Sequence, residues 1–491
     1  MKHLLSILVA AILIAVSCQS PTSPTQCPPG FRCECVAIKP PPDTISPTDG
    51  DAASKFGSCS FTWTPVDKMG AFSFVNTFIS ADFISTADGI FVEPIWKSRT
   101  DPDAGLDSWI KALNDKDCTP WICLNQTPSW MLPGTGQESA DYPPVQKGSS
   151  RTDPKSYAEY ARIFGELAKR YGSVKHPESD LWVNTASRWT NDGPNQKISG
   201  LGYKFALTVW NEPDRFWHKG DGTGIYMEPE EYAALFVACY EAVKAADPKV
   251  PCYMAGLTGT DMDYMARFIN ALKSMGKPLP DALVIHKYCH KGNEAGKHPP
   301  TWFDSGACAP ELDKSFNDIK AFVSYAKSLS RPLFVTEFGI DTRPPSWMYA
   351  PPFAGKTSEQ IQAEWVCRTY LEYLRLGVDK MSVFNGNDEQ GAINGGLYTN
   401  SGLLYGEGEQ GKIFKPKPAY AAVTALVSAL RGMKFTKDES TAQARIMRFE
   451  SGAKTVWYYW SPTASGATLP LTIQGHAVTV TEAPQYFSIS K

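Results

Sequence analysis

Short apolar runs alternate with longer segments of helical periodicity over most of this 491-residue chain. Apolar runs bounded by Gly, Pro or Asn are typical of buried strands, and apolar residues at three- and four-residue intervals predict helices. Their strict alternation predicts an α/β fold, a (β/α)8 TIM barrel over residues 65–432. The expected strands are 71–76, 89–96, 119–125, 205–210, 251–256, 282–290, 333–335 and 380–385, and the expected helices are 106–114, 157–171, 229–246, 312–328, 358–376 and 419–430.

The pattern changes after residue 433, where apolar and polar residues alternate in short stretches such as ARIMRF, TVWYYW and YFSIS. Such stretches, about ten residues apart, predict a small C-terminal antiparallel β-sandwich. Five strands are too few to close it, so we expect residues 56–66 to complete it. The sandwich either supports the barrel or binds carbohydrate.

Two glutamates stand where apolar runs end. Glu212 follows the run FALTVW and precedes Pro213, which cannot extend a strand. Glu337 follows the run LFVT and precedes Phe338 and Gly339. An acid at the carboxyl end of a buried parallel strand is placed for chemistry. Two such acids on one sheet are what a two-carboxylate glycosidase needs.

The sequence WNEPD, followed much later by TEFG, resembles the clan A retaining glycoside hydrolases. Within the clan it looks most like family 39, which holds β-xylosidases and α-L-iduronidases, and the resemblance covers residues 65–491. It implies that Glu212 is the general acid/base and Glu337 the nucleophile. It also implies that Asn211 binds the sugar 2-hydroxyl.

The family pattern further implies that His286 lines the cleft and that Tyr288 hydrogen-bonds the nucleophile. His286, Tyr288 and His290 alternate and would share one face of a strand. A metal site made of these three is the alternative, but a strand spaces them poorly for one ion. We expect His290 to lie in the following loop, and we predict no metal and no cofactor.

Aromatic residues make up 12% of the chain and include 14 tryptophans. They serve either as ordinary core residues or as flat platforms for sugar rings. Trp130 and Trp210 are the candidates for sugar contacts, although Trp210 fits the core equally well. Phe384 ends the eighth predicted strand, where many members of the clan carry a tryptophan that stacks on the sugar. With phenylalanine at this position, the sequence does not establish that the same contact with the sugar in the −1 subsite is made.

With a net charge of −3, the chain as a whole shows no tendency to bind nucleic acid, and we predict no nucleic-acid partner. The predicted loops at the barrel mouth are nevertheless basic. This charge either marks an anionic substrate, such as a uronic-acid or sulfated glycan, or is ordinary solvated loop charge. The residues concerned are Lys97, Arg99, Arg215, His218, Lys219, Lys287, His290, Lys291, Lys297 and His298.

The first 18 residues predict a secretory signal. Lys2 and His3 precede an apolar run over residues 4–16, too short for a transmembrane helix, and Ala15-Val16-Ser17-Cys18 resembles a bacterial lipobox. Cys18 would then be lipidated and hold the protein on a membrane by an anchor only. The alternative is a plain signal peptide. Residues 19–55, rich in Pro, Ser and Thr, would form a tether.

Twelve cysteines fit an oxidising compartment. Cys289 and Cys308 bracket a loop and are the best candidates for a disulfide, whereas the odd separation of Cys118 and Cys123 along a strand points them to opposite faces, so we do not expect them to pair. No paired C-x-x-C spacing predicts a metal site.

The sequence thus predicts a retaining glycoside hydrolase acting on a polysaccharide or oligosaccharide, held in the bacterial outer membrane and facing the periplasm or the exterior. The alternatives are a β-xylosidase with a neutral substrate and a non-catalytic glycan-binding lipoprotein.

Overall fold

The computed structural model describes residues 50–91, 105–132, 134, 139–186, 195–297, 306–389, 396–406 and 411–490. The predicted signal segment, Cys18 and most of the tether therefore lie outside the described residues, as does most of the strand predicted at 89–96. Among the residues that are described, no helix is both long and apolar enough to cross a membrane.

Eight parallel strands form one sheet in the order β7-β6-β5-β2-β1-β10-β9-β8. The two outer strands meet where Leu257 bridges to Ile285, which closes the sheet into the predicted barrel. All strands therefore present their carboxyl ends at the same mouth. The strands are β1 (Phe56–Cys59), β2 (Phe74–Ser80), β5 (Thr119–Asn125), β6 (Ala206–Val209), β7 (Cys252–Met254), β8 (Leu283–His286), β9 (Leu333–Phe338) and β10 (Lys380–Val383).

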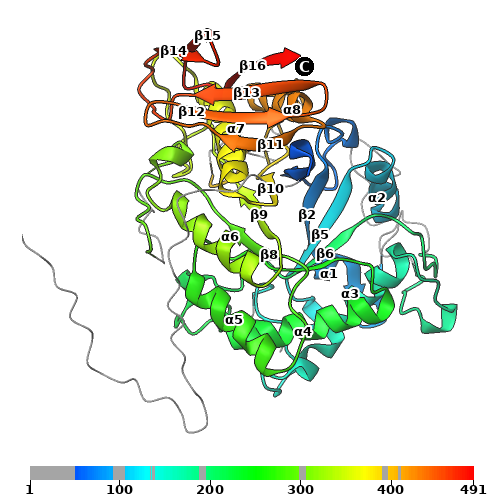
Figure 1. Cartoon of the computed structure of the whole chain (residues 1–491). Helices are drawn as coiled ribbons and strands as arrows, with labels where there is room; N and C mark the ends of the chain where they lie inside the picture. Colours follow the sequence, from blue (N-terminus) through cyan, green and yellow to red (C-terminus); the bar gives the residue numbers. More distant parts are fainter. Residues whose placement is uncertain are drawn as a thin grey trace, which may run out of the picture. The chain divides into compact units, whose positions relative to one another are not determined.

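Helices surround this barrel (Figure 1). Helix α4 starts at Pro229, whose missing N–H suits a first turn, and α7 is capped by Gly377, which adopts a φ of 90°. The helices are α1 (Ala81–Ile84), α2 (Leu106–Asn114), α3 (Ala158–Tyr171), α4 (Pro229–Ala246), α5 (Met262–Ser274), α6 (Ile319–Ser328), α7 (Ser358–Leu376) and α8 (Pro418–Leu430).

The first two barrel strands differ from the prediction. Phe56–Cys59 pairs in parallel with β2 and β10, so the expectation that residues 56–66 complete the sandwich is wrong. Gly57 permits this placement, since a Cβ there would lie 2.4 Å from the Phe74 ring. The run predicted as the first strand is the second, and Gly89–Ile90 (β4) pairs instead with Ser85–Thr86 (β3) in a small hairpin.

The C-terminal residues form the predicted antiparallel sheets. One sheet has the order β11-β12-β13-β16 and the other pairs β14 with β15. Side chains of the two sheets share a small apolar cluster that includes Ile446, Trp457, Ile473 and Val480. The strands are β11 (Lys434–Asp438), β12 (Arg445–Glu450), β13 (Lys454–Trp460), β14 (Leu469–Ile473), β15 (His476–Val480) and β16 (Gln485–Ser490).

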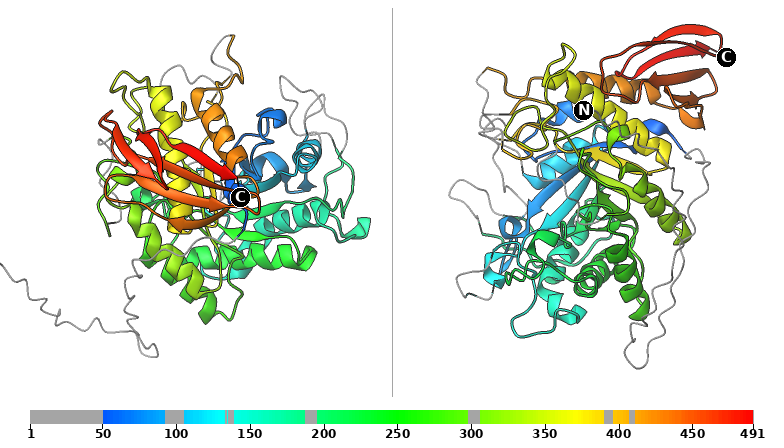
Figure 2. Two further views of the ribbon diagram at one scale, coloured as in Figure 1. Left: turned by 45° about the horizontal axis from the view of Figure 1, so that its top comes forward. Right: turned by 90° about the vertical axis from the view of Figure 1, so that its left-hand side faces the viewer.

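The C-terminal sheet lies beside α7 and α8 (Figure 2). Arg368 of α7 is fully buried, pairs with Glu311 at 2.6 Å and donates to the Thr463 carbonyl. The Trp460 indole also donates to Glu311. Buried, paired charges of this kind fix one arrangement of the two parts, because removing either partner leaves the other charge unpaired.

Every cysteine in the described part of the chain is a buried free thiol. The predicted disulfide between Cys289 and Cys308 is therefore absent. The two segments do meet, through a hydrogen bond from the Cys308 N–H to the Cys289 carbonyl, but this backbone pairing leaves each sulfur in the core as a free thiol.

Candidate active site

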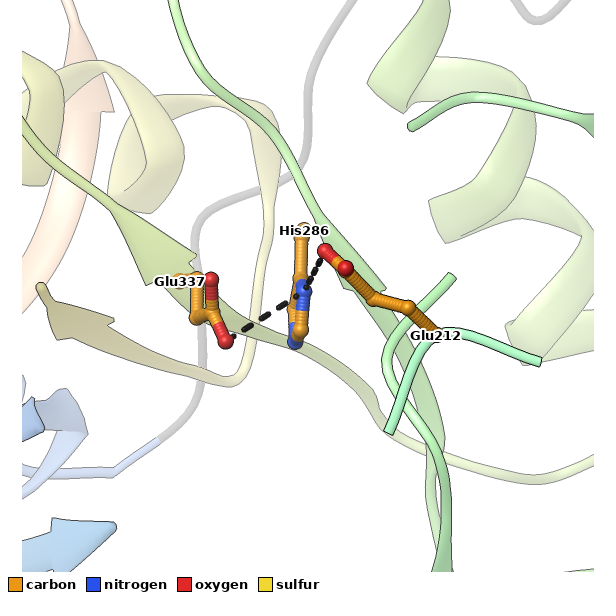
Figure 3. A group of neighbouring side chains, drawn as sticks. All are labelled: Glu212, His286 and Glu337. Atoms are coloured by element: carbon orange, nitrogen blue, oxygen red, sulfur yellow. Dashed lines mark hydrogen bonds and ion pairs between the residues drawn. The ribbon is translucent and has the colours of Figure 1, made fainter. Parts of the chain in front are cut away.

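The two predicted glutamates meet at the barrel mouth. Glu212 follows β6, the fourth barrel strand, and Glu337 lies in β9, the seventh. His286, the last residue of β8, stands between them (Figure 3). Its Nδ1 lies 2.9 Å from Glu212 Oε1 and 3.5 Å from Glu337 Oε1. One donor atom from each of the three residues lies within 4.8 Å of the others.

The backbone that carries Glu212 is unusual. Trp210 and Glu212 both have positive φ angles, 71° and 47°. Left-handed backbone at residues other than glycine costs about 1–3 kcal/mol each and tends to occur at functional sites. The Glu212 N–H donates to the Gly256 carbonyl at 3.2 Å, which helps to hold this turn.

Gly256 also makes room for His286. A Cβ at position 256 would lie only 2.0 Å from His286 Nε2. The imidazole therefore lies directly on the backbone that follows β7. This contact at Nε2, together with the two carboxylates close to Nδ1, fixes the imidazole ring at the mouth of the barrel.

The charges of the three groups are linked. Burial raises the pKa of Glu337 to about 7, although the nearby His286 and a hydrogen bond from Tyr288 act in the opposite direction. Burial alone would lower the pKa of His286, but the charge of Glu337 and the hydrogen bond to Glu212 raise it above its usual value. A proton on His286 therefore lies between two carboxylates.

Tyr288 contacts Glu337 as predicted. Its hydroxyl donates to Glu337 Oε2 at 2.8 Å. Asn211 lines the same cavity, and its Oδ1 is buried without a hydrogen-bond partner among the described residues. Buried polar atoms are normally hydrogen-bonded, so this one is available to a ligand.

The cavity above the glutamates has a volume of about 690 Å³. That is within the usual range for sites that bind small molecules. Its walls are mainly aromatic and uncharged side chains. They include Phe61, Phe78, Asn125, Asn211, Trp217, Thr258, Thr260, Tyr288, Asn293, Trp347, Phe384 and Tyr398.

The predicted aromatic contacts fall in different places. Phe384 lines the cavity and packs edge-on against Phe78 and Tyr398. Trp210 is buried and contacts Tyr160, so it belongs to the core. Trp130 is not a lining residue of this cavity. Its indole N–H donates to the Ser85 hydroxyl, and its ring packs against Trp182.

The basic residues of the mouth are mostly neutralised. Lys287 is buried and pairs with Asp313 at 2.7 Å, and Lys297 pairs with Glu294. Arg215 pairs with Asp141, again at 2.7 Å. His290 follows β8 as expected, and burial lowers its pKa to about 3, so it is uncharged. Lys97, Arg99 and His298 lie outside the described residues.

Several lining residues were not predicted. Asn125 ends β5, the strand whose bounds the sequence indicated correctly, so the strand-end rule that identified Glu212 could have found it. Trp217 lies in a short 3₁₀ helix, and Trp347 and Tyr398 lie in loops. Nothing local in the sequence marks these three residues. For a metal ion, Glu212, His286 and Glu337 are the group with suitable donors among the described residues.

No family model matches the sequence, and neither does any curated protein. Among solved structures, a family 39 glycoside hydrolase from Bacteroides cellulosilyticus WH2 aligns over 91% of this chain and 83% of its own, with 16% identity and a TM-score of 0.58. A monomeric β-xylosidase from Caulobacter crescentus CB15 aligns over 87% and 80%, with 16% identity and a TM-score of 0.51. SrfJ from Salmonella typhimurium aligns over 90% and 89%, with 12% identity and a TM-score of 0.53. At these identities the chain is similar to such proteins in its fold.

Proposed function

We propose that the protein is a retaining glycoside hydrolase. The observation that supports this most directly is the spacing of its two carboxyl groups, since an oxygen of Glu212 lies within 4.8 Å of one of Glu337. Retaining enzymes place these groups about 5–5.5 Å apart, whereas inverting enzymes leave about 6.5–9.5 Å for a water molecule. The glycoside hydrolases with similar folds support the same class of reaction.

Glu337 is the nucleophile in this proposal. It is the more buried of the two, with 9% of its side chain exposed against 19% for Glu212. The Tyr288 hydroxyl donates to its second oxygen, which favours the carboxylate over the acid. The first oxygen faces His286 and the cavity, where it can attack an anomeric carbon.

Glu212 is the acid and base. Its Oε1 faces His286 Nδ1 at 2.9 Å, so a proton shared by this pair lies next to the cavity. In the first step Glu212 protonates the departing oxygen while Glu337 forms an ester with the sugar. In the second, Glu212 takes a proton from water, which attacks the anomeric carbon and releases Glu337.

The substrate we propose is a neutral glycan, such as a xylo-oligosaccharide. Each charged lysine that lines the described part of the cavity already has an acidic partner, which leaves little positive charge for a uronic acid or a sulfate. Asn211 Oδ1 is placed to accept a bond from a sugar hydroxyl. An anionic glycan is the alternative, and cleavage of one polymer in charged and neutral forms would separate the two.

Three measurements test the reaction. Glu337→Gln should abolish hydrolysis of a panel of plant, algal and bacterial glycans without loss of glycan binding. Glu212→Gln should fail on oligosaccharides yet retain activity on glycosyl fluorides, whose leaving group needs no proton. Nuclear magnetic resonance of the first product should show retained anomeric configuration. Wild type that binds glycans but is as inert as Glu337→Gln would instead be a non-catalytic glycan-binding lipoprotein.

We also propose that the protein is an outer-membrane lipoprotein anchored through Cys18, on the basis of the sequence pattern AVSC. The test is Cys18→Ala expressed in a Gram-negative host. Wild type should partition with membranes and incorporate labelled palmitate, whereas the variant should do neither. Equal partitioning of both proteins would contradict the anchor.

A further inference from the structure

Trp217 is an exposed tryptophan on the wall of the cavity. Its exposed fraction is 46%. Among the strongly exposed large apolar residues of the described chain, it alone lines the cavity that holds Glu212 and Glu337. Leaving an indole half exposed forgoes much of the stabilisation that its burial would give. This position therefore suits a ligand better than it suits the fold.

The segment that carries Trp217 is firmly held. Trp217 lies in a short 3₁₀ helix, Phe216–His218, and follows Glu212 and its strained turn by five residues. Asp214 in this segment is buried and accepts hydrogen bonds from Thr258 N–H and Oγ1 at 3.0 Å. Next to it, Arg215 pairs with Asp141. The Phe216 ring packs edge-on against the indole, with 5.1 Å between centroids. The backbone around Trp217 is thus held in place by contacts within the protein.

We propose that Trp217 is the stacking platform of a saccharide-binding subsite on the leaving-group side of Glu212. The inference rests on the proposed function and identifies the ligand as the neutral sugar whose glycosidic oxygen Glu212 protonates as it departs. The residue that delivers the proton faces the departing oxygen, and Trp217 follows Glu212 by five residues and lines the same cavity.

The wall near Trp217 suits an uncharged sugar. Thr258, Gly259 and Thr260 follow β7 and line the same cavity. Asp214 ties Thr258 to the loop of Trp217, so the two loops form one rigid unit. Lys219, beyond Trp217, lies 3.7 Å from Glu228 and is not a lining residue. An indole face and a threonine hydroxyl can contact the apolar and polar parts of a sugar ring.

A saccharide bound at this subsite would also bear on the second step, because the glycosyl ester of a retaining mechanism can react with a sugar hydroxyl as well as with water. A second saccharide that stacks on Trp217 presents a hydroxyl to Glu212. Glu212 takes the hydroxyl proton, the oxygen attacks the anomeric carbon, and the ester bond to Glu337 breaks. A new glycosidic bond forms, Glu337 leaves as a carboxylate, and Glu212 ends protonated. The acceptor thus replaces water in the second step.

The test compares leaving groups that do and do not reach the platform. Wild type, Trp217→Ala and Trp217→Phe are assayed with the glycosyl fluoride and the trisaccharide of whichever sugar, among xylose, glucose, galactose and mannose, the wild type cleaves. For Trp217→Ala, kcat/KM on the trisaccharide should fall about tenfold or more, while kcat/KM on the fluoride should change less than twofold. Trp217→Phe should recover part of the loss. The yield of transfer product from the fluoride with added disaccharide should fall in Trp217→Ala.

Tyr486→Ala, which removes an exposed aromatic ring from β16 in the C-terminal sheet, is the matched control and should leave both substrates unaffected. Equal loss on fluoride and trisaccharide, or no loss on either, would overturn the subsite.

A binding experiment separates this inference from the proposed reaction. Xylotriose, cellotriose and mannotriose are titrated calorimetrically into Glu337→Gln with and without Trp217→Ala. Weaker binding in the double variant would support the subsite even if the wild type hydrolysed nothing. Equal affinity of both proteins, or no binding by either, would overturn it.

Discussion

Replacing Glu337 by glutamine should stabilise the folded protein at alkaline pH while it stops turnover. Burial raises the pKa of this carboxyl from 4.5 to about 7, so its charged form is less stable in the folded protein than in the unfolded chain. At about 1.36 kcal/mol for each pH unit, the rise corresponds to about 3 kcal/mol. Glutamine has almost the same shape and carries no charge.

The direction of the pH effect on stability depends on which state, folded or unfolded, keeps the proton of Glu337. Below pH 4.5 both the folded and the unfolded state carry the proton, so glutamine and the protonated acid have equivalent effects on stability. Between about 4.5 and 7 the folded state keeps a proton that the unfolded state has lost, so the contribution of Glu337 to stability falls as pH rises. His286, whose pKa is raised chiefly by Glu337 and Glu212 against the effect of burial, changes stability in the same direction.

The assay is urea unfolding at pH 5, 6.5 and 8. The free energy of unfolding of Glu337→Gln relative to wild type should increase with pH, by up to about 3 kcal/mol at pH 8. Glu178→Gln makes the same chemical change at an exposed site and should stay within about 0.5 kcal/mol of wild type at every pH. If the two profiles for wild type and Glu337→Gln run parallel, Glu337 is not a destabilised buried carboxylate and the electrostatic account of the site fails.

Three further predictions concern the site and its support. The kcat/KM should decline as pH falls below about 7, because Glu337 gains its proton, and Tyr288→Phe should move this limb to higher pH by removing a bond that favours the carboxylate; an unmoved limb would contradict it. Gly256→Ala should lower kcat more than it changes KM, because its Cβ would displace His286, and wild-type kinetics would contradict that contact. Lys287→Met should cost about 3–5 kcal/mol of stability in urea unfolding by leaving Asp313 buried without its partner, whereas Lys287→Met/Asp313→Leu should recover part of the loss.

The sequence predicted elements whose signals are local. The bounds of α2, α4, α7 and β5 matched the pattern of apolar residues and caps. Strand β1 was missed because Gly57, Ser58 and Cys59 give no apolar run, and the Phe74 ring of the neighbouring strand β2, which leaves no room for a side chain at Gly57, is far away in sequence. Helix α5 was missed although Asp261 caps it and apolar residues recur along one face, so that signal was present and overlooked.

The residues of the site also fall into those that local sequence predicts and those that it does not. Glu212 and Glu337 were predictable because strand ends in a closed parallel sheet converge. Neither the pairing of the basic loop residues nor the cavity positions of Trp347 and Tyr398 was predictable. These depend on contacts between distant segments, such as the hydrogen bonds from Tyr398 N–H and Asn400 N–H to Asp341.

The pairing of Arg368 with Glu311 has a consequence for how this chain can be divided. Glu311 lies two residues before Asp313, whose partner Lys287 separates His286 from Tyr288, so one short segment joins the C-terminal sheet to the floor of the cavity. Calorimetry should therefore show a single cooperative melting transition. A truncated chain ending at residue 432 should aggregate instead of yielding an active minimal enzyme, because deletion would uncover a guanidinium and a carboxylate that no longer have their full set of partners.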